Sequence, residues 1–522
     1  MPPTRPASRL APTGLVCADD HLAAQAGVAA LRAGGSAADA AVAASAVLAV
    51  TCQHMCGMGG DLFALVHRPG AERPFALNAS GRAGSGADPD RLRAEGHHRM
   101  PVAGDIRSVP VPGCVDGWLA LHERFGRLPL ADVLADAVRY AEDGFPASPL
   151  LAATAPNVAG VPGGEDFAVA TRPGATVRRP GAARALRAIT ASGRDGFYGG
   201  EFGAGLLHLG SGEYTSDDLA EANADWVEPL SAEAWGHRLW TTPPNSQGYL
   251  TLAGAWIAER AGLPVEPGGD LWAHVGVEAA RQASFDRLDV LHEHADGREL
   301  ISERRLAPRA AAVDPDRAAL LGGRFAPGGT TFLCAVDGQR MGVSLIQSNA
   351  TGFGAAIAEP STGIFLHNRG IGFSLVAGHP AEYGPRRRPP HTLSPVLVTR
   401  SGELAAVAGT MGGDSQPQIL LQVLARVLHG GQDAAEAVGA PRWVLRRPAS
   451  TWGFETWEER GTVEVCLEPG CPEAWEAGLL RRGHAVRPEP GNYGHAQLIV
   501  SRGEHLEGAA DPRALVGDAA GY

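Results

Sequence analysis

The chain has 522 residues, 44% hydrophobic and 20% charged, which suits one large globular unit or two moderate domains. Its formal net charge of −12 disfavours nucleic-acid partners, and no run of about 18 apolar residues predicts a membrane span. All 45 residues counted as lysine or arginine are arginine, which excludes a P-loop lysine, a lysine Schiff base and a Ser-x-x-Lys acylation site. Residues 1–15 lack the continuous apolar core of a secretory signal, so we expect a cytoplasmic protein.

Helices and a glycine loop dominate the first part of the chain. Apolar spacing predicts a helix over residues 21–32 and an alanine-rich helix over 37–50 that is buried against a sheet. A glycine loop at 57–60 precedes the first strands. Further predicted elements are strands at 62–67 and 75–78, helices at 130–142 and 270–293, and short helices with loops over 151–230.

From residue 330 onward, the pattern of apolar residues predicts mostly strands. Residues 331–336 are apolar at nearly every position, as expected of a strand covered on both faces, and Asp337-Gly338 predicts a hairpin back to 341–346. The basic run 386–388 is predicted to be a solvated loop. The other predicted elements are strands at 363–367, 395–398, 404–408 and 495–500 and helices at 419–428 and 472–481. The first of these helices follows Gly412-Gly413, and Pro417 suits its first turn.

Common metal, cofactor and nucleophile motifs are missing from the sequence. The seven cysteines form no C-x-x-C pair, so neither a zinc site nor a disulfide framework is predicted. There is no H-E-x-x-H helix and no G-x-S-x-G elbow. We therefore expect an activity without metal or organic cofactor.

The junction between Gly329 and Thr330 is a candidate site for a threonine nucleophile. The Pro/Gly-rich approach 324–329 leads into Thr330 at the head of a predicted buried strand. If the Gly329–Thr330 bond were cleaved, Thr330 would hold both a hydroxyl and an α-amine, whose pKa of about 7.7–8.0 allows it to act as a base at neutral pH. Glycine before the bond permits the strained backbone that an N→O acyl shift needs. Taken alone, these residues also fit a loop that enters a strand.

Motifs elsewhere favour the cleavage interpretation. In chain order they are the helical run 25–43, the glycine loop 57–60, Asn78-Ala79-Ser80-Gly81-Arg82, Thr330-Thr331, Gly412-Gly413 and the C-terminal run 510–522. Together they resemble the γ-glutamyltransferase family of N-terminal-nucleophile hydrolases over nearly the whole chain. The resemblance implies an α+β fold, a four-layer αββα sandwich. It also implies self-cleavage into a large segment, 1–329, and a small segment, 330–522, that remain together as a heterodimer.

The resemblance also implies roles for individual residues. Thr330 Oγ would attack an acyl carbonyl while its own amine takes the proton. The backbone N–H groups of Gly412 and Gly413 would stabilise the oxyanion just before a helix N-terminus. Arg82 would hold a substrate carboxylate, a task its planar guanidinium suits, although a surface salt bridge is the alternative. Water or an amine acceptor would then release the acyl group.

The substrate pocket departs from the family pattern. Where the family has an Asn-Gln-x-Asp-Asp-Phe segment, whose aspartate binds the α-ammonium of the substrate, this chain has Gly372 in place of that acid. His391-Thr392 stand where the family has paired serines. The residues predicted to bind substrate are Arg82, Ser348, Asn349, Arg369, His391 and Thr392. A pocket with arginine and without that acid predicts an acyl group with a carboxylate and no amine, such as glutaryl or oxalyl.

These observations predict an N-terminal-threonine amidohydrolase or acyltransferase acting on a small-molecule acyl substrate. Three alternatives stay open at this point. The first is true γ-glutamyl transfer or glutathione hydrolysis. The second is hydrolysis of a C–C bond to an oxalyl-type group in natural-product biosynthesis. The third is an uncleaved relative that only binds.

Overall fold

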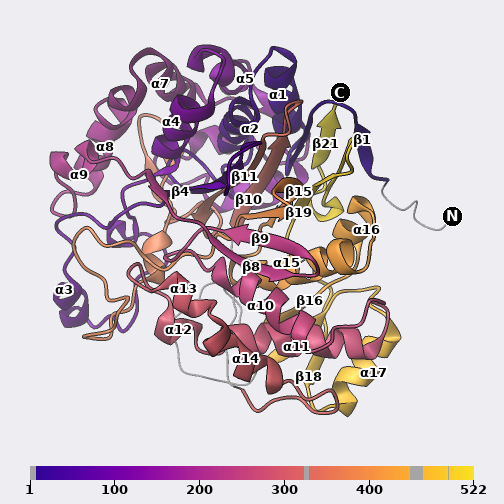
Figure 1. Cartoon of the computed structure of the whole chain (residues 1–522). Helices are drawn as coiled ribbons and strands as arrows, with labels where there is room; N and C mark the ends of the chain where they lie inside the picture. Colours follow the sequence, from indigo (N-terminus) through magenta and orange to yellow (C-terminus); the bar gives the residue numbers. More distant parts are fainter. Residues whose placement is uncertain (1–6, 322–328, 447–462, 492) are drawn as a thin grey trace.

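Two seven-stranded sheets form the centre of the computed structural model (Figure 1), which describes residues 7–321, 329–446, 463–491 and 493–522. Sheet A has the order β1-β20-β19-β15-β14-β9-β8 and sheet B the order β21-β2-β10-β11-β3-β4-β7. The strands of sheet A are β1 (Arg9–Ala11), β8 (Leu230–Ala234), β9 (His237–Thr241), β14 (Val396–Arg400), β15 (Glu403–Thr410), β19 (Ala496–Ser501) and β20 (Leu506–Ala510). Those of sheet B are β2 (Leu15–Ala18), β3 (Asp61–His67), β4 (Phe75–Ala79), β7 (Asp225–Val227), β10 (Gly329–Val336), β11 (Gly342–Ala350) and β21 (Asp518–Gly521).

Strand β10 lies in the middle of sheet B, antiparallel to both β2 and β11. The apolar run in this strand is buried on both faces, as the sequence predicts, because one face meets sheet A and the other meets helices. Its pairing with β11 is regular from Thr331 to Val336 but shifts between Gly329 and Thr331. Thr330 therefore lies at the irregular head of an otherwise continuous ladder.

Helices cover the outer face of each sheet (Figure 1). Over sheet B lie α1 (His21–Arg32), α2 (Ala37–Thr51), α4 (Cys114–Phe125), α5 (Leu130–Asp143) and α7 (Pro180–Tyr198). Over sheet A lie α10 (Tyr249–Arg260), α11 (Asp270–Ser284), α15 (Gln416–Leu424) and α16 (Ala434–Gly439). Every residue of α2 is buried, because its alanines allow helix and sheet to approach closely.

Smaller elements complete the structure. The short helices are α3 (Pro89–Ala94), α6 (Pro149–Thr154), α8 (Glu201–Leu209), α9 (Ser216–Ala220), α12 (Arg287–Val290), α13 (Gly297–Leu300), α14 (Glu303–Ala311) and α17 (Glu473–Arg481). The remaining strands are β5 (Phe145–Pro146), β6 (Thr176–Val177), β12 (Ala358–Glu359), β13 (Ile364–Phe365), β16 (Trp443–Arg446), β17 (Glu464–Leu467) and β18 (Ala485–Pro488). Within the described ranges, no helix combines the length and the apolar character needed to cross a membrane.

The predicted helix over 21–32 is confirmed, with Asp20 accepting a hydrogen bond from the Leu22 amide as its N-cap. The expectation of only short helices and loops over 151–230 is wrong, because α7 runs for 19 residues with a break at Gly193. Half of its buried residues are alanine or glycine, which weakens the helical period in the sequence. The predicted helix over 270–293 ends earlier, at Ser284, and the strand at 363–367 shortens to two residues.

Candidate active site

Thr330 is buried at the head of β10, with 1% of its surface exposed. Its Oγ1 atom lies 3.1 Å from Oγ of Ser348, which comes from the neighbouring strand β11. The rest of the predicted approach, residues 324–328, lies outside the described residues. The Thr330 hydroxyl thus lies beside a second hydroxyl, at the point where the β10–β11 pairing becomes irregular.

Arg369 joins this pair to a fourth polar residue. It lies in the single turn Arg369–Gly372 and is 1% exposed. Its guanidinium donates to Ser348 Oγ over 3.2 Å and to Thr392 Oγ1 over 3.0 Å. Burial lowers the pKa of Arg369 to about 10, so the side chain still carries its charge at neutral pH. Thr330, Ser348, Arg369 and Thr392 thus form one continuous polar chain.

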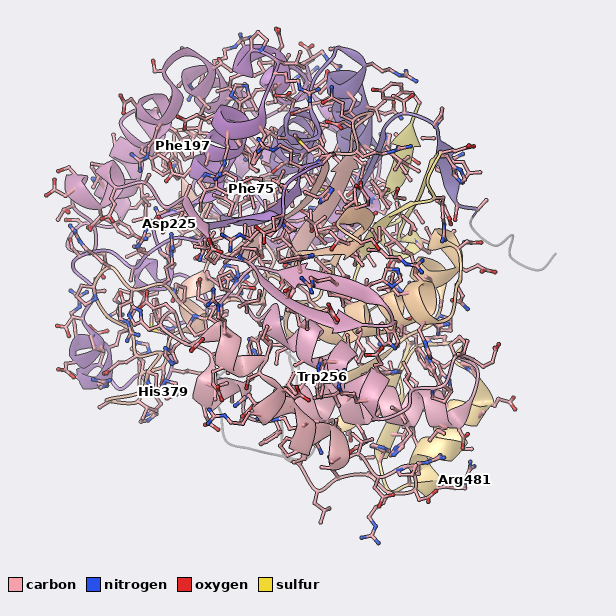
Figure 2. The ribbon with its side chains drawn as sticks, viewed as in Figure 1. Phe75, Phe197, Asp225, Trp256, His379 and Arg481 are labelled. Carbon is pink, nitrogen blue, oxygen red and sulfur yellow. The ribbon has the colours of Figure 1, made fainter. Side chains whose placement is uncertain are left out.

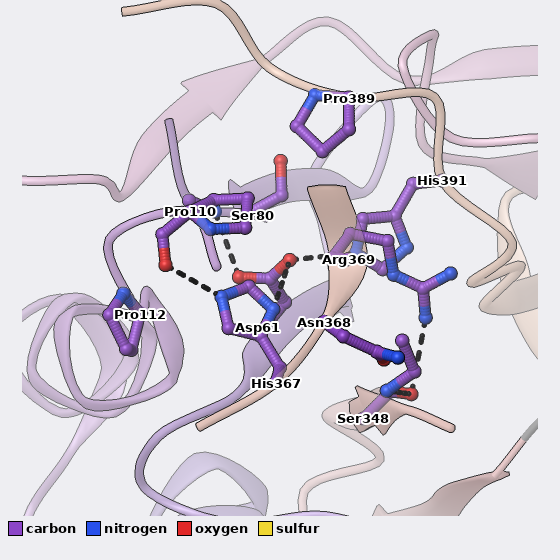
Figure 3. A network of polar contacts seen from close by, with 12 residues as sticks. Asp61, Ser80, Pro110, Pro112, Ser348, His367, Asn368, Arg369, Pro389 and His391 are labelled. Carbon is purple, nitrogen blue, oxygen red and sulfur yellow. Dashed lines mark hydrogen bonds and ion pairs between the residues drawn. The ribbon is translucent and has the colours of Figure 1, made fainter. Parts of the chain in front are cut away.

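Asp61 is the centre of a second network, drawn in Figure 3. One carboxylate oxygen accepts from His391 Nε2 over 2.9 Å and lies 3.4 Å from His367 Nδ1, and the other accepts from the Gly81 amide over 2.8 Å. Burial alone would raise the pKa of Asp61, but the facing imidazole of His367 and the bond from His391 bring it to about 2. Burial and the charge of Arg369 lower the pKa of His391 to about 3. At neutral pH the carboxylate is therefore charged and His391 is neutral.

Gly412 and Gly413 follow β15, with φ values of 137° and 56°. Side chains rarely tolerate a positive φ, so glycine suits both positions. The short turn Gly413–Ser415 then leads into α15, in which Pro417 stands in the first turn as predicted. This junction lies just before the N-terminus of α15, the positive end of the helix dipole, which is the environment expected of an oxyanion site.

The structure places other predicted residues away from this chain of contacts. Asn349 donates from Nδ2 to the Gln53 carbonyl over 3.0 Å, which holds β11 to the segment between α2 and the glycine loop. Arg82, whose side chain is 23% exposed, forms an ion pair with Asp225 at 2.8 Å and donates to Asn223. Asp225, labelled in Figure 2, lies on β7 at the edge of sheet B.

The solvated-loop prediction for the basic run is wrong at Arg388. Its buried guanidinium pairs with Asp225 at 2.8 Å and donates to the Ser80 carbonyl over 2.9 Å. Arg82 and Arg388 therefore share one carboxylate. Arg82, Arg388 and Asp225 lie close to the Asp61 network along the chain, because the amide of Gly81, the residue before Arg82, donates to Asp61.

Sequence reasoning missed Asp61 and His367. One signal was present: a charged residue directly after the glycine loop opens a strand that is otherwise apolar. A carboxylate buried at such a position requires partners. The imidazoles that supply them lie more than 300 residues away in the sequence, so their identity could not be read locally.

A threonine at the head of a central strand, an arginine linked to it through Ser348 and a glycine pair before a helix are features that acyl-transfer chemistry uses. A family model described as gamma-glutamyltranspeptidase matches residues 23–522, so the chain belongs to that family. It is 36% identical to the oxamate amidohydrolase proenzyme of Klebsiella pneumoniae, with 99% of each chain covered. It is 35% identical to the glutathione hydrolase-like YwrD proenzyme of Bacillus subtilis, over 96% of this chain and 97% of that one. The solved cephalosporin acylase of Bacillus halodurans superposes with a TM-score of 0.89 at 32% identity, covering 100% of this chain and 98% of that one.

Proposed function

We propose that the protein is a self-processing amidohydrolase or acyltransferase whose nucleophile is Thr330, freed by cleavage after Gly329. The observation that carries the proposal is the position of Thr330, buried at the irregular head of β10 and 3.1 Å from Ser348. In the precursor, Thr330 Oγ attacks the Gly329 carbonyl and an N→O shift gives an ester. Water hydrolyses that ester to a Gly329 carboxylate and a free α-amine on Thr330.

After cleavage, the hydroxyl and the α-amine of Thr330 carry out the reaction with the acyl substrate. Thr330 Oγ attacks the acyl carbonyl carbon, and the hydroxyl proton passes to the α-amine. The N–H groups of Gly412 and Gly413 stabilise the negative charge on the carbonyl oxygen. Collapse breaks the amide bond, and the leaving amine takes the proton. Water, or an amine acceptor, finally attacks the Thr330 ester and restores the hydroxyl.

Cleavage would leave the two segments interleaved, as a four-layer sandwich shared by a heterodimer. In sheet B, β10 and β11 from the segment 330–522 lie between β2 and β3 from the segment 1–329. In sheet A, four strands of the later segment lie between β1 and β9 of the earlier one. Separation would break ladders on both sides of each insert, so we expect one stable heterodimer.

Arg369 is the proposed anchor for a carboxylate on the acyl group. Of the two predicted arginines, it is the one whose contacts reach Thr330, through Ser348. Thr392 and Ser348 add hydroxyl groups beside the guanidinium. Arg82, paired with Asp225, is proposed as a weaker second anchor. The relative named oxamate amidohydrolase is consistent with a substrate that carries a carboxylate next to an amide.

The environment of Gly372 argues against a γ-glutamyl substrate. A Cβ atom at this position would lie 2.4 Å from the Pro390 carbonyl oxygen, so an aspartate there would require the backbone to move. Without an acid at this place, a substrate α-ammonium would be left without its partner at a cost of about 2–5 kcal/mol. A comparison of glutaryl and γ-glutamyl anilides tests this point, since faster release from the γ-glutamyl compound would contradict it.

The lack of lysine provides a direct test of processing. An amine-reactive ester can label only α-amines in this chain, so cleavage adds one new labelled site, at Thr330. We expect wild-type protein to give two fragments with the label on the smaller one, and Thr330→Ala to stay as one 54.1 kDa chain. An intact, singly labelled wild-type chain after prolonged incubation would refute the proposal.

A further inference from the structure

Gln247 lies between β9 and α10 and is fully buried. Its Nε2 atom donates to two backbone carbonyls, that of Thr392 over 2.7 Å and that of Gly413 over 2.9 Å. One side chain from the segment 1–329 therefore touches two parts of the candidate site in the segment 330–522. Nothing in the sequence marks this residue, because its partners lie far along the chain.

The Gly412–Gly413 loop, residues 411–413, has three carbonyls in succession that each accept a hydrogen bond. The Met411 carbonyl accepts from Thr410 Oγ1 over 2.7 Å, and the Gly412 carbonyl accepts from the Ser415 amide over 3.0 Å. In a trans peptide the next N–H points away from the carbonyl, so these two bonds orient the N–H groups of Gly412 and Gly413. The third carbonyl, that of Gly413, is held by Gln247.

This third bond differs from the first two because it comes from a separate element. The bonds to Met411 and Gly412 lie within the loop and would move with it. Glycines are conformationally permissive, so a loop with two of them can swing as a unit unless something outside fixes it. The Met411 amide bonds to the His495 carbonyl over 3.2 Å and Arg287 pairs with Asp414, and the bond from Gln247 adds the contact that ties the loop to the Thr392 segment.

Gln247 itself is held in place. Ser246 and His391 pair in an isolated parallel bridge. The His391 amide donates to the Asn245 carbonyl over 2.8 Å, and the Gln247 amide donates to the His391 carbonyl over 2.9 Å. Ser246 Oγ adds a bond of 2.7 Å to the Leu393 carbonyl. The side chain of Gln247 thus extends from a backbone that is already fixed against the Thr392 segment.

We propose that Gln247 is a positioning residue that fixes the Gly412–Gly413 loop relative to Thr392, and so relative to Arg369. The inference rests on the proposed function, since it concerns donors to the oxyanion of the acyl transfer. Donors that are fixed before reaction lower the barrier, while donors that must reorganise do not. Gln247 would therefore act on the rate of the chemical step more than on substrate binding.

The test uses Gln247→Met, which keeps the length of the side chain but removes both hydrogen-bond donors. Rates are measured with a glutaryl anilide and divided by the amount of labelled Thr330 amine, so that slow processing does not count as slow turnover. We expect kcat to fall about 10- to 100-fold, somewhat less than the loss of an oxyanion donor itself, with KM within about threefold of wild type. Gln247→Glu is expected to be at least about threefold faster than Gln247→Met at pH 6, because its protonated carboxyl can donate one bond.

Gln422→Met is the matched control. Gln422 is also buried, and its Nε2 also bridges two carbonyls, those of Gln418 and Trp443, but it lies within α15. Gln422 Oε1 also accepts from the Trp443 amide over 3.1 Å, so this variant should lose at least as much thermal stability while keeping the wild-type kcat. Equal kcat in Gln247→Met and wild type, or no gain in Gln247→Glu, would overturn the inference. A wild-type chain that is cut at Thr330 but releases no acyl product would refute the proposed function, and the inference with it.

Discussion

Replacing Arg369 with glutamine separates the anchor role from a general role in the site. The side chain is buried, its charge persists at neutral pH, and it donates to two hydroxyls beside Thr330. A substrate carboxylate paired with it would be shielded from water, so its loss should cost about 2–5 kcal/mol. Since each 1.4 kcal/mol is a factor of ten, kcat/KM for a glutaryl anilide should fall about 30- to 5,000-fold.

The size of this effect must depend on the carboxylate. A butyryl anilide has no group for Arg369 to bind, so we expect Arg369→Gln to change its kcat/KM by less than about fivefold. Arg82→Gln should reduce glutaryl turnover by at most about tenfold, because Arg82 is partly exposed and paired with Asp225, where ion pairs contribute about 1 kcal/mol or less. Initial rates of anilide release with both substrates measure these ratios. Equal losses on glutaryl and butyryl compounds would refute the anchor role.

Three further predictions concern stability and the oxyanion loop. Asp61→Asn should lower the free energy of unfolding by about 3–5 kcal/mol in thermal melts, because it breaks a buried charged network, while Glu233→Gln, at an exposed ion pair with Arg238, should cost about 1 kcal/mol or less. His391 stays neutral in the fold down to about pH 3 but takes up a proton near pH 6.5 when unfolded, so it makes stability fall as pH drops from 6 to 4. His391→Gln should reduce that slope by about 1.4 kcal/mol per pH unit, and an unchanged slope would contradict the assignment. Arg287→Met should lower both stability and kcat, because it removes the arginine that pairs with buried Asp414 at 2.9 Å directly after the glycine pair, and an unaltered melting temperature would count against this.

Local patterns were enough to predict some parts of the site. The apolar run after Thr330 indicated a strand buried on both faces, and Gly412-Gly413 followed by Pro417 indicated a loop leading into a helix. These features depend on backbone conformation and on neighbours a few residues away. The order of motifs along the chain then supplied the family, which the match over residues 23–522 confirms.

Contacts between distant segments could not be predicted in this way. Arg388 belongs to a run of three arginines, a composition typical of exposed loops, yet Asp225 and two backbone carbonyls satisfy it in the interior. Asp61 and His391 are 330 residues apart, and neither has a partner that its own neighbourhood predicts. Burial of a charge is decided by what the fold places beside it, which a single sequence does not state.

The interleaved topology connects the fold to the proposed chemistry. A nucleophile released by cleavage at a chain end would normally gain mobility, since chain termini tend to be poorly ordered. In the proposed cleavage the released end would be the head of β10, a strand that pairs with β11 regularly from Thr331 and with β2 from Leu333. The cut would therefore create an α-amine without breaking these ladders, and the hydroxyl would keep its place beside Ser348. Cleavage would supply the chain with a new amine, and the sheet would hold that amine at the proposed site of reaction.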